Sequence, residues 1–113
     1  MNTKDELIKK LEEKGGRYWS KNGKERIYFS PKNIFNLIVN YYKSGYISSA
    51  KLDGDYISNA EAARCLNVAC YVDVTGNAPR VITQNADRIH APARKLLDNF
   101  VAEISEVIEE SKK

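Results

Sequence analysis

The chain has 113 residues, of which 42% are hydrophobic and 29% are charged, and its formal net charge is +3. This size and composition fit one globular domain spanning residues 1–113 and exclude an intrinsically disordered chain. No apolar run approaches the roughly 18 residues of a membrane-spanning helix, and the first residues carry no hydrophobic signal segment. We therefore expect a cytoplasmic protein without membrane association.

The first third of the chain predicts a helix followed by a β-hairpin. Apolar residues recur at helical spacing within residues 3–14, and two glycines end that helix. Two aromatic-rich segments, 17–20 and 25–30, then flank Asn22-Gly23. That dipeptide accepts the positive φ angles of a tight two-residue turn, so we expect an antiparallel hairpin.

The middle of the chain predicts a second helix and a strand. Ser30 is a typical helix N-cap and Pro31 suits the first helical position. The apolar face that follows extends to Tyr42, and Gly45 ends the helix. This face is broad, which predicts that the helix lies across a sheet. Residues 46–52 form the predicted strand.

The second half predicts a short helix, a second hairpin and a long final helix. The short helix begins at Ser58, strands follow at 70–74 and 80–83, and apolar residues recur every three or four positions after Pro92. We therefore expect an α+β fold, in which a small, mostly antiparallel sheet of two hairpins plus a central strand packs with helices. A long C-terminal amphipathic helix completes it.

Few residues point to catalysis or to a cofactor. His90 is the only histidine, Cys65 and Cys70 lie in apolar surroundings, and Asp53-Gly54-Asp55 is typical of a turn rather than of a calcium loop. A Cys–His nucleophile pair would need the fold to bring His90 to a cysteine, and no spacing indicates this. We therefore expect no enzyme, no catalytic residues, no metal site and no cofactor.

The first hairpin is the strongest candidate for a binding surface, because it interleaves cations with aromatic side chains. Such interleaving neutralises phosphates while bases stack on the rings; an ordinary solvated strand face and a protein contact are the alternatives. Neighbouring residues on a strand point to opposite faces, so one member of each adjacent aromatic pair is expected in the core. The candidate nucleic-acid or partner-binding residues are Arg17, Trp19, Lys21, Lys24, Arg26 and Tyr28.

The C-terminal helix offers an alternative surface. Its apolar stripe is long enough either to cover the sheet or to pair with a second copy or another protein. The residues of this partner helix would be Phe100, Ile104, Val107 and Ile108.

Residues 57–68 offer a third possibility, since they are similar to the first helix and turn of a helix-turn-helix DNA-binding unit. A predicted strand, however, stands where the second, recognition helix would begin.

Two stretches of the sequence resemble small proteins of phages and other mobile elements. Residues 19–29 follow a W-x-K-x-G-x-x-R-I-Y-F pattern. Residues 51–62, which contain I-S-N-x-E-A at a helix start, are followed by residues 71–76, and both resemble the same group. The resemblance implies a small accessory protein of phage or mobile-element origin, and it supplies no catalytic residues.

These observations predict a small non-catalytic binding protein that contacts nucleic acid, or a nucleic-acid-handling protein, through the basic aromatic hairpin. The alternative is a protein-binding inhibitor or dimeric structural protein acting through the C-terminal helix, for example against a host defence or replication factor. The partners under consideration are thus nucleic acid, a host or phage protein, and a second copy of the chain as a homodimer.

Overall fold

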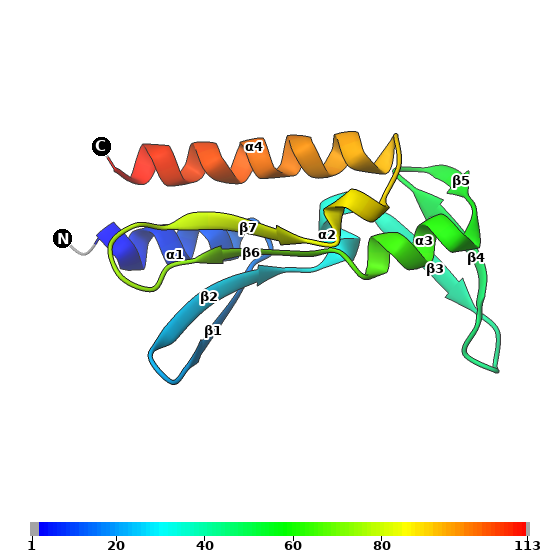
Figure 1. Cartoon of the computed structure of the whole chain (residues 1–113), viewed down its shortest axis with the longest axis horizontal. Coiled ribbons are helices and arrows are strands. Elements are labelled where there is room, and N and C mark those ends of the chain that lie inside the picture. The colour runs from blue at the N-terminus through cyan, green and yellow to red at the C-terminus, as the bar shows by residue number, and fades with distance from the viewer. Residues whose placement is uncertain (1–2, 113) are drawn as a thin grey trace.

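In the computed structural model, which describes residues 3–112, helices and strands are interspersed along the chain (Figure 1). The helices are α1 (Thr3–Glu13), α2 (Pro31–Phe35), α3 (Asn59–Leu66) and α4 (Ala93–Ser111), with one short 3-10 helix, η1 (Ala86–Arg88). The strands are β1 (Arg17–Lys21), β2 (Lys24–Phe29), β3 (Leu37–Tyr41), β4 (Ile47–Leu52), β5 (Asp55–Ile57), β6 (Ala69–Asp73) and β7 (Arg80–Gln84). The predicted α+β class is confirmed, including the long C-terminal helix. Within the described part of the chain, no helix combines the length and apolar character needed to cross a bilayer.

The two predicted hairpins join into one antiparallel four-stranded sheet in the order β1-β2-β6-β7. In the first turn Asn22 and Gly23 both have positive φ, of 54° and 79°, as a tight two-residue turn requires. Strand β2 then pairs with β6, which places Tyr28 beside Tyr71. This pairing merges two hairpins that are far apart in the sequence into one continuous surface.

A second antiparallel sheet, in the order β3-β4-β5, occupies much of the middle of the chain. The predicted strand at residues 46–52 is confirmed as β4, but it is the middle strand of this separate sheet. The short strand β5 was not predicted. Asp53 and Gly54 form the turn between β4 and β5, both with positive φ.

The helix predicted from Pro31 to Gly45 is wrong over most of its length. Helix α2 ends at Phe35, and Asn36 adopts left-handed backbone angles of φ 49° and ψ 55°. After Asn36 the chain extends as β3, because its residues pair with β4 and their burial alternates from Leu37 to Asn40. The apolar residues fitted a helical period, but the backbone reversal at Asn36 rules that continuation out.

Helices α1 and α4 contact each other and lie on one face of the four-stranded sheet, and the core is enclosed between them and the strands (Figure 1). Strand β2 contributes Ile27 and Phe29, and β6 contributes Cys70 and Val72, each at most 4% exposed. Gly16 permits the close approach of α1 to β2, because a Cβ atom there would collide with the Ile27 side chain. Residues that alternate with these core positions point away from the helices.

Helix α3 begins as predicted, because the Ser58 hydroxyl accepts a hydrogen bond from the Glu61 backbone N–H at 3.1 Å. Strand β6 is the next element after α3. The helix-turn-helix possibility therefore lacks its recognition helix.

Candidate nucleic-acid interface

The outer face of the four-stranded sheet, which points away from α1 and α4, carries all six residues predicted for the hairpin. In an antiparallel sheet, directly paired residues point to the same face. The pairs are Arg17 with Tyr28, Trp19 with Arg26, and Lys21 with Lys24. The structure thus brings these side chains together, whereas Ile27 and Phe29 of β2 face the core.

Strands β6 and β7 extend this face with residues that the sequence did not single out. Tyr71 lies between Tyr28 and Ile82, and Asp73 lies between its two register partners, Arg26 and Arg80. The sequence signal for these residues is the alternation of polar and apolar residues along β6. That pattern places them on the outer face only once the pairing of β2 with β6 is known. We call the surface formed by the following residues the basic-aromatic face: Arg17, Trp19, Lys21, Lys24, Arg26, Tyr28, Tyr71 and Arg80.

Arg26 is the centre of the basic-aromatic face. Its guanidinium carbon lies 5.5 Å from the centre of the Trp19 ring and 4.7 Å from the centre of the Tyr71 ring, within cation–π range of both. Its Nη1 donates to the Tyr28 hydroxyl at 2.9 Å, and this hydrogen bond raises the pKa of Arg26 above its ordinary value. The guanidinium is therefore held in one position among three rings.

The aromatic rings also contact one another. The centre of the Tyr28 ring lies 6.1 Å from that of Trp19, in an edge-to-face arrangement, and 5.1 Å from that of Tyr71. Tyr71 is 6% exposed and supports the cluster, whereas Trp19 is 36% exposed. A shallow depression beside Trp19 is lined by Arg17, Tyr18, Trp19 and Tyr28. Trp19 is thus the fixed but accessible ring of the group.

The charge of the outer face is predominantly positive. Within the four strands of this sheet, all of them described by the structure, five cations on this face accompany one carboxylate, Asp73. The Thr75 backbone N–H donates to Asp73 Oδ1 at 2.9 Å, and Thr75, together with the positive charges of Arg80 and Arg26, holds the pKa of Asp73 below its usual range. Asp73 is already engaged, so the face keeps an excess of positive charge.

Glu25, the one carboxylate of the first hairpin, lies on the helix side of the sheet. Lys4 of α1 forms an ion pair with it, and the Tyr18 hydroxyl donates to Glu25 Oε1 at 2.6 Å. The hydrogen bond from Lys4 is the main reason that the pKa of Glu25 lies below its usual value. The negative charge of Glu25 is therefore compensated by α1 and offsets little of the charge on the basic-aromatic face.

The four residues predicted for a partner helix are largely occupied within the chain. Ile104 and Ile108 are 0% and 4% exposed. Phe100 is half-buried and packs edge-on against Phe29, with ring centres 5.0 Å apart. Val107 is half-buried as well. In the structure, the stripe of α4 covers the sheet, which is one of the two roles that the sequence left open.

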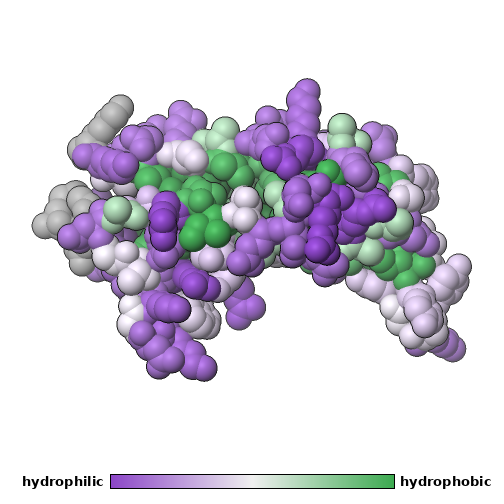
Figure 2. Space-filling model, in the orientation of Figure 1, coloured by the Kyte–Doolittle hydropathy of each residue, from purple (hydrophilic) through white to green (hydrophobic). Residues whose placement is uncertain are grey.

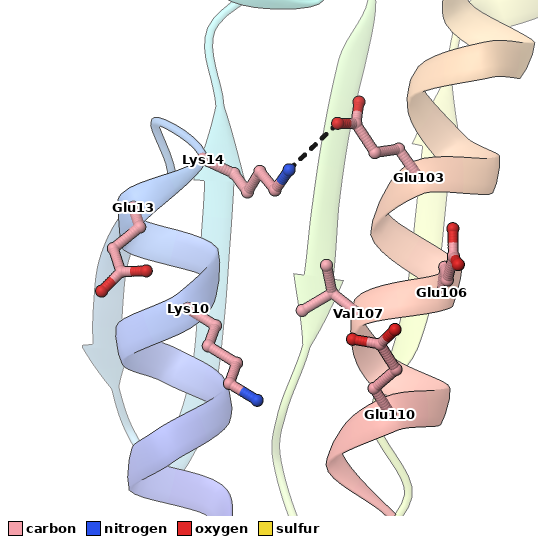
Figure 3. A pocket seen from close by; sticks show the side chains of 7 residues that line it. All are labelled: Lys10, Glu13, Lys14, Glu103, Glu106, Val107 and Glu110. Carbon is pink, nitrogen blue, oxygen red and sulfur yellow. Dashed lines mark hydrogen bonds and ion pairs between the residues drawn. The ribbon is translucent and has the colours of Figure 1, made fainter.

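The groove between α1 and α4 is bordered by charges of both signs (Figure 3). Lys14 donates to Glu103 Oε1 at 3.0 Å across the groove, and Lys10 faces it from the same side as Lys14. Both partners of the ion pair are about half exposed, so the pair contributes little stability. Val107 is the apolar residue of the lining. The groove therefore lacks the apolar surface that a second helix would need. It also carries no uniform charge that would attract a charged ligand.

The two thiols lie inside the protein, whereas the histidine lies at its surface. Cys65 and Cys70 are free and buried, and burial raises the pKa of each to about 11, so both are protonated near neutral pH. His90 is exposed, and its backbone N–H donates to Glu61 Oε1 at 2.8 Å. Among residues 3–112, no three His, Cys, Asp or Glu side chains are grouped closely enough to hold a metal ion.

Comparisons of the chain with protein-family models, with curated proteins and with solved structures find no match. The fold and the site alone therefore define its class. It is an α+β protein whose four-stranded sheet is covered by two helices on one face and presents a basic-aromatic face on the other.

Proposed function

We propose that this protein is a non-catalytic module that binds single-stranded nucleic acid through its basic-aromatic face. The observation that carries the proposal is the cluster of Trp19, Arg26 and Tyr71, which lies on the same side of the sheet as four further cations. Cations bind phosphates and release their counterions, which supplies affinity for any nucleic acid.

The aromatic component favours a single strand over a duplex. Unpaired bases are free to stack on a protein ring, whereas the bases of a duplex are already stacked on each other. Trp19 presents an exposed ring that its neighbours hold in place, so little side-chain freedom is lost when a base stacks on it. A strand laid across β1 and β2 would contact this ring and the flanking cations together.

The alternative function, a protein-binding inhibitor or dimeric structural protein acting through the C-terminal helix, has less support. Ile104 and Ile108 would have to leave the core to reach a partner. The setting in phage or mobile-element biology rests on the sequence resemblance of residues 19–29, 51–62 and 71–76 alone.

Fluorescence anisotropy tests the proposal, using a labelled homopolymer of about 20 nucleotides as DNA or RNA, with a duplex of the same length for comparison. We expect the single strands to bind more tightly than the duplex. Binding should weaken between about 50 and 200 mM salt, with a logarithmic slope of about 0.7 per phosphate contact. Trp19→Ala should weaken binding about tenfold, because one stacked base contributes about 1–3 kcal/mol.

Lys9→Ala is the control. Lys9 is an exposed cation of α1, which packs on the opposite face of the sheet from Trp19, so its loss removes one positive charge away from the basic-aromatic face. This variant should bind like the unsubstituted protein. Equal affinities of Trp19→Ala and the unsubstituted protein would contradict the proposal, and so would the absence of binding at the lower salt concentration.

A further inference from the structure

A second group of large exposed side chains lies on the three-stranded sheet and on the turn between β3 and β4. The proposed function does not involve this group. Its members are large, water-facing and mostly tyrosine. We call them the tyrosine surface: Ile38, Tyr41, Tyr42, Tyr46 and Tyr56, which are 58%, 51%, 62%, 77% and 74% exposed. The sequence pattern did not indicate this surface, and it predicted three of its members, Ile38, Tyr41 and Tyr42, in a helix packed across a sheet.

The strand register gathers part of the tyrosine surface on one face. Ile38 pairs with Lys51, and Lys51 pairs with Tyr56, so the three side chains form a row across the sheet. The Lys51 ammonium lies 4.8 Å from the centre of the Tyr56 ring. This row therefore repeats, on a smaller scale, the combination of cation and ring that marks the basic-aromatic face.

The remaining tyrosines lie at or beside the tip of the β3–β4 hairpin, where backbone hydrogen bonds close the turn. The Tyr42 backbone N–H donates to the Tyr46 carbonyl at 2.8 Å, and the Gly45 N–H donates to the Tyr42 carbonyl at 2.9 Å. Gly45 closes this turn with a φ of +93°, which a residue with a side chain rarely adopts. The turn thus presents Tyr42 and Tyr46 from a closed loop, with Lys43 between them in the sequence.

The charge of the β3–β4 hairpin suits a polyanion, because from Arg26 to Leu52 the sequence contains four cations and no carboxylate. The next carboxylates, Asp53 and Asp55, lie at the β4–β5 turn, which is the other end of β4 from the hairpin tip. The glutamates of α4, in contrast, belong to a helix that runs along the opposite side of the molecule from both hairpin tips (Figure 1). A polyanion approaching the hairpins therefore meets positive charge and tyrosine rings while remaining away from the acidic helix.

Both hairpins project from the same side of the molecule, and the outline is recessed between them (Figure 2). One projection is the β1–β2 hairpin and the other is the β3–β4 hairpin. The longest dimension of the molecule is 48 Å. At about 3.4 Å per nucleotide, a stacked strand of roughly 15 nucleotides covers that length, within the range of known single-strand binding sites.

We propose that the tyrosine surface is a second contact for the same single strand, so that one strand runs from the basic-aromatic face to the β3–β4 hairpin. This inference rests on the proposed function. It adds that affinity depends on strand length, because a short oligomer reaches one surface and a long one reaches both.

The experiment compares oligomers of about 5 and about 20 nucleotides, as DNA and as RNA, in the anisotropy assay. The test protein carries Tyr42→Ala and Tyr46→Ala together; both rings are exposed, so the fold should be retained, which thermal unfolding checks. We expect this double variant to bind the long oligomer about tenfold more weakly and the short one unchanged. Trp19→Ala should weaken both, and Lys9→Ala should weaken neither.

The outcomes separate the two proposals. If the double variant binds the long oligomer like the unsubstituted protein while Trp19→Ala loses affinity, the tyrosine surface is not a contact and the proposed function stands. If neither variant changes affinity, both proposals fail. Equal loss on short and long oligomers would overturn the spanning arrangement. Retained nucleic-acid binding with loss of self-association in light scattering would overturn the inference and assign the tyrosine surface to a contact between protein copies.

Discussion

Arg26 lies between the rings of Trp19 and Tyr71 and is hydrogen-bonded to Tyr28, so its side chain organises the basic-aromatic face in addition to supplying charge. A lysine in its place keeps the charge but has no planar fork to lie between two rings. The guanidinium therefore has a role that charge alone does not fulfil.

We expect Arg26→Ala to lower the thermal unfolding midpoint by a few degrees and Arg26→Lys to restore only part of the loss. Arg17→Ala, which removes an exposed cation at the start of the same hairpin, is the control and should change the midpoint little. Differential scanning calorimetry measures all three. Full rescue by lysine would show that the two cation–π contacts do not hold the cluster together.

The buried thiols of Cys65 and Cys70 make the stability of the protein depend on pH. Their folded-state pKa of about 11 exceeds the ordinary value of 9.0, so the folded protein holds these protons more tightly than the unfolded chain does. Their contribution to the free energy of unfolding is therefore complete below about pH 9 and is lost as the pH rises toward about 11.

Urea unfolding across that pH range should give a smaller decline for the double variant Cys65→Ala, Cys70→Ala than for the unsubstituted protein. A thiol-specific reagent such as dithionitrobenzoate should react slowly with the folded protein and rapidly in urea. Rapid labelling of the folded protein at neutral pH would contradict the burial of these thiols.

The apolar stripe of helix α4 contains positions that differ in burial. Ile104 is fully buried against the sheet, whereas Val107 is half-buried at the edge of the groove with α1. A helix that serves mainly as a cover for the core should be sensitive at the first position and tolerant at the second.

Ile104→Ala should lower the free energy of unfolding by about 2–5 kcal/mol and Val107→Ala by about 1 kcal/mol. Chemical denaturation measures both, and light scattering reports whether either change alters the oligomeric state. A stable Ile104→Ala monomer derived from a dimeric unsubstituted protein would contradict the role of α4 as core and revive the alternative function.

Features that depend on neighbouring residues could be predicted from the sequence, whereas features that depend on pairing between distant strands could not. The β1–β2 hairpin and the common face of its six candidate residues follow from Asn22-Gly23 and from alternation, which are local. Tyr71 and Arg80 join that face only through the pairing of β2 with β6, which no local pattern encodes.

The failure at β3 has a different cause. The apolar residues on either side of Asn36 satisfy a helical period as well as an alternating one, and the left-handed backbone at Asn36 decides between them. Because Asn tolerates that conformation without requiring it, the sequence pattern is ambiguous at this point. Because the segment after Asn36 was predicted as a helix, the exposed positions of Ile38, Tyr41 and Tyr42 were not predicted.

The two long sides of the whole molecule differ in charge and shape. Helix α4 with its glutamates forms one side, and both hairpins project from the other (Figure 1). Under the proposed function, this polarity would orient an incoming nucleic acid, and salt would weaken the orientation.

The most direct test of the central claim uses the fluorescence of Trp19, the only tryptophan of the chain. Its emission reports on the basic-aromatic face and on no other part of the molecule. Titration with an unlabelled single-stranded oligomer should quench the emission to saturation at low salt, and added salt should reverse the quenching as the strand dissociates. Unchanged emission at an oligomer concentration that saturates binding by anisotropy would contradict the account, because the strand would then bind without stacking on Trp19.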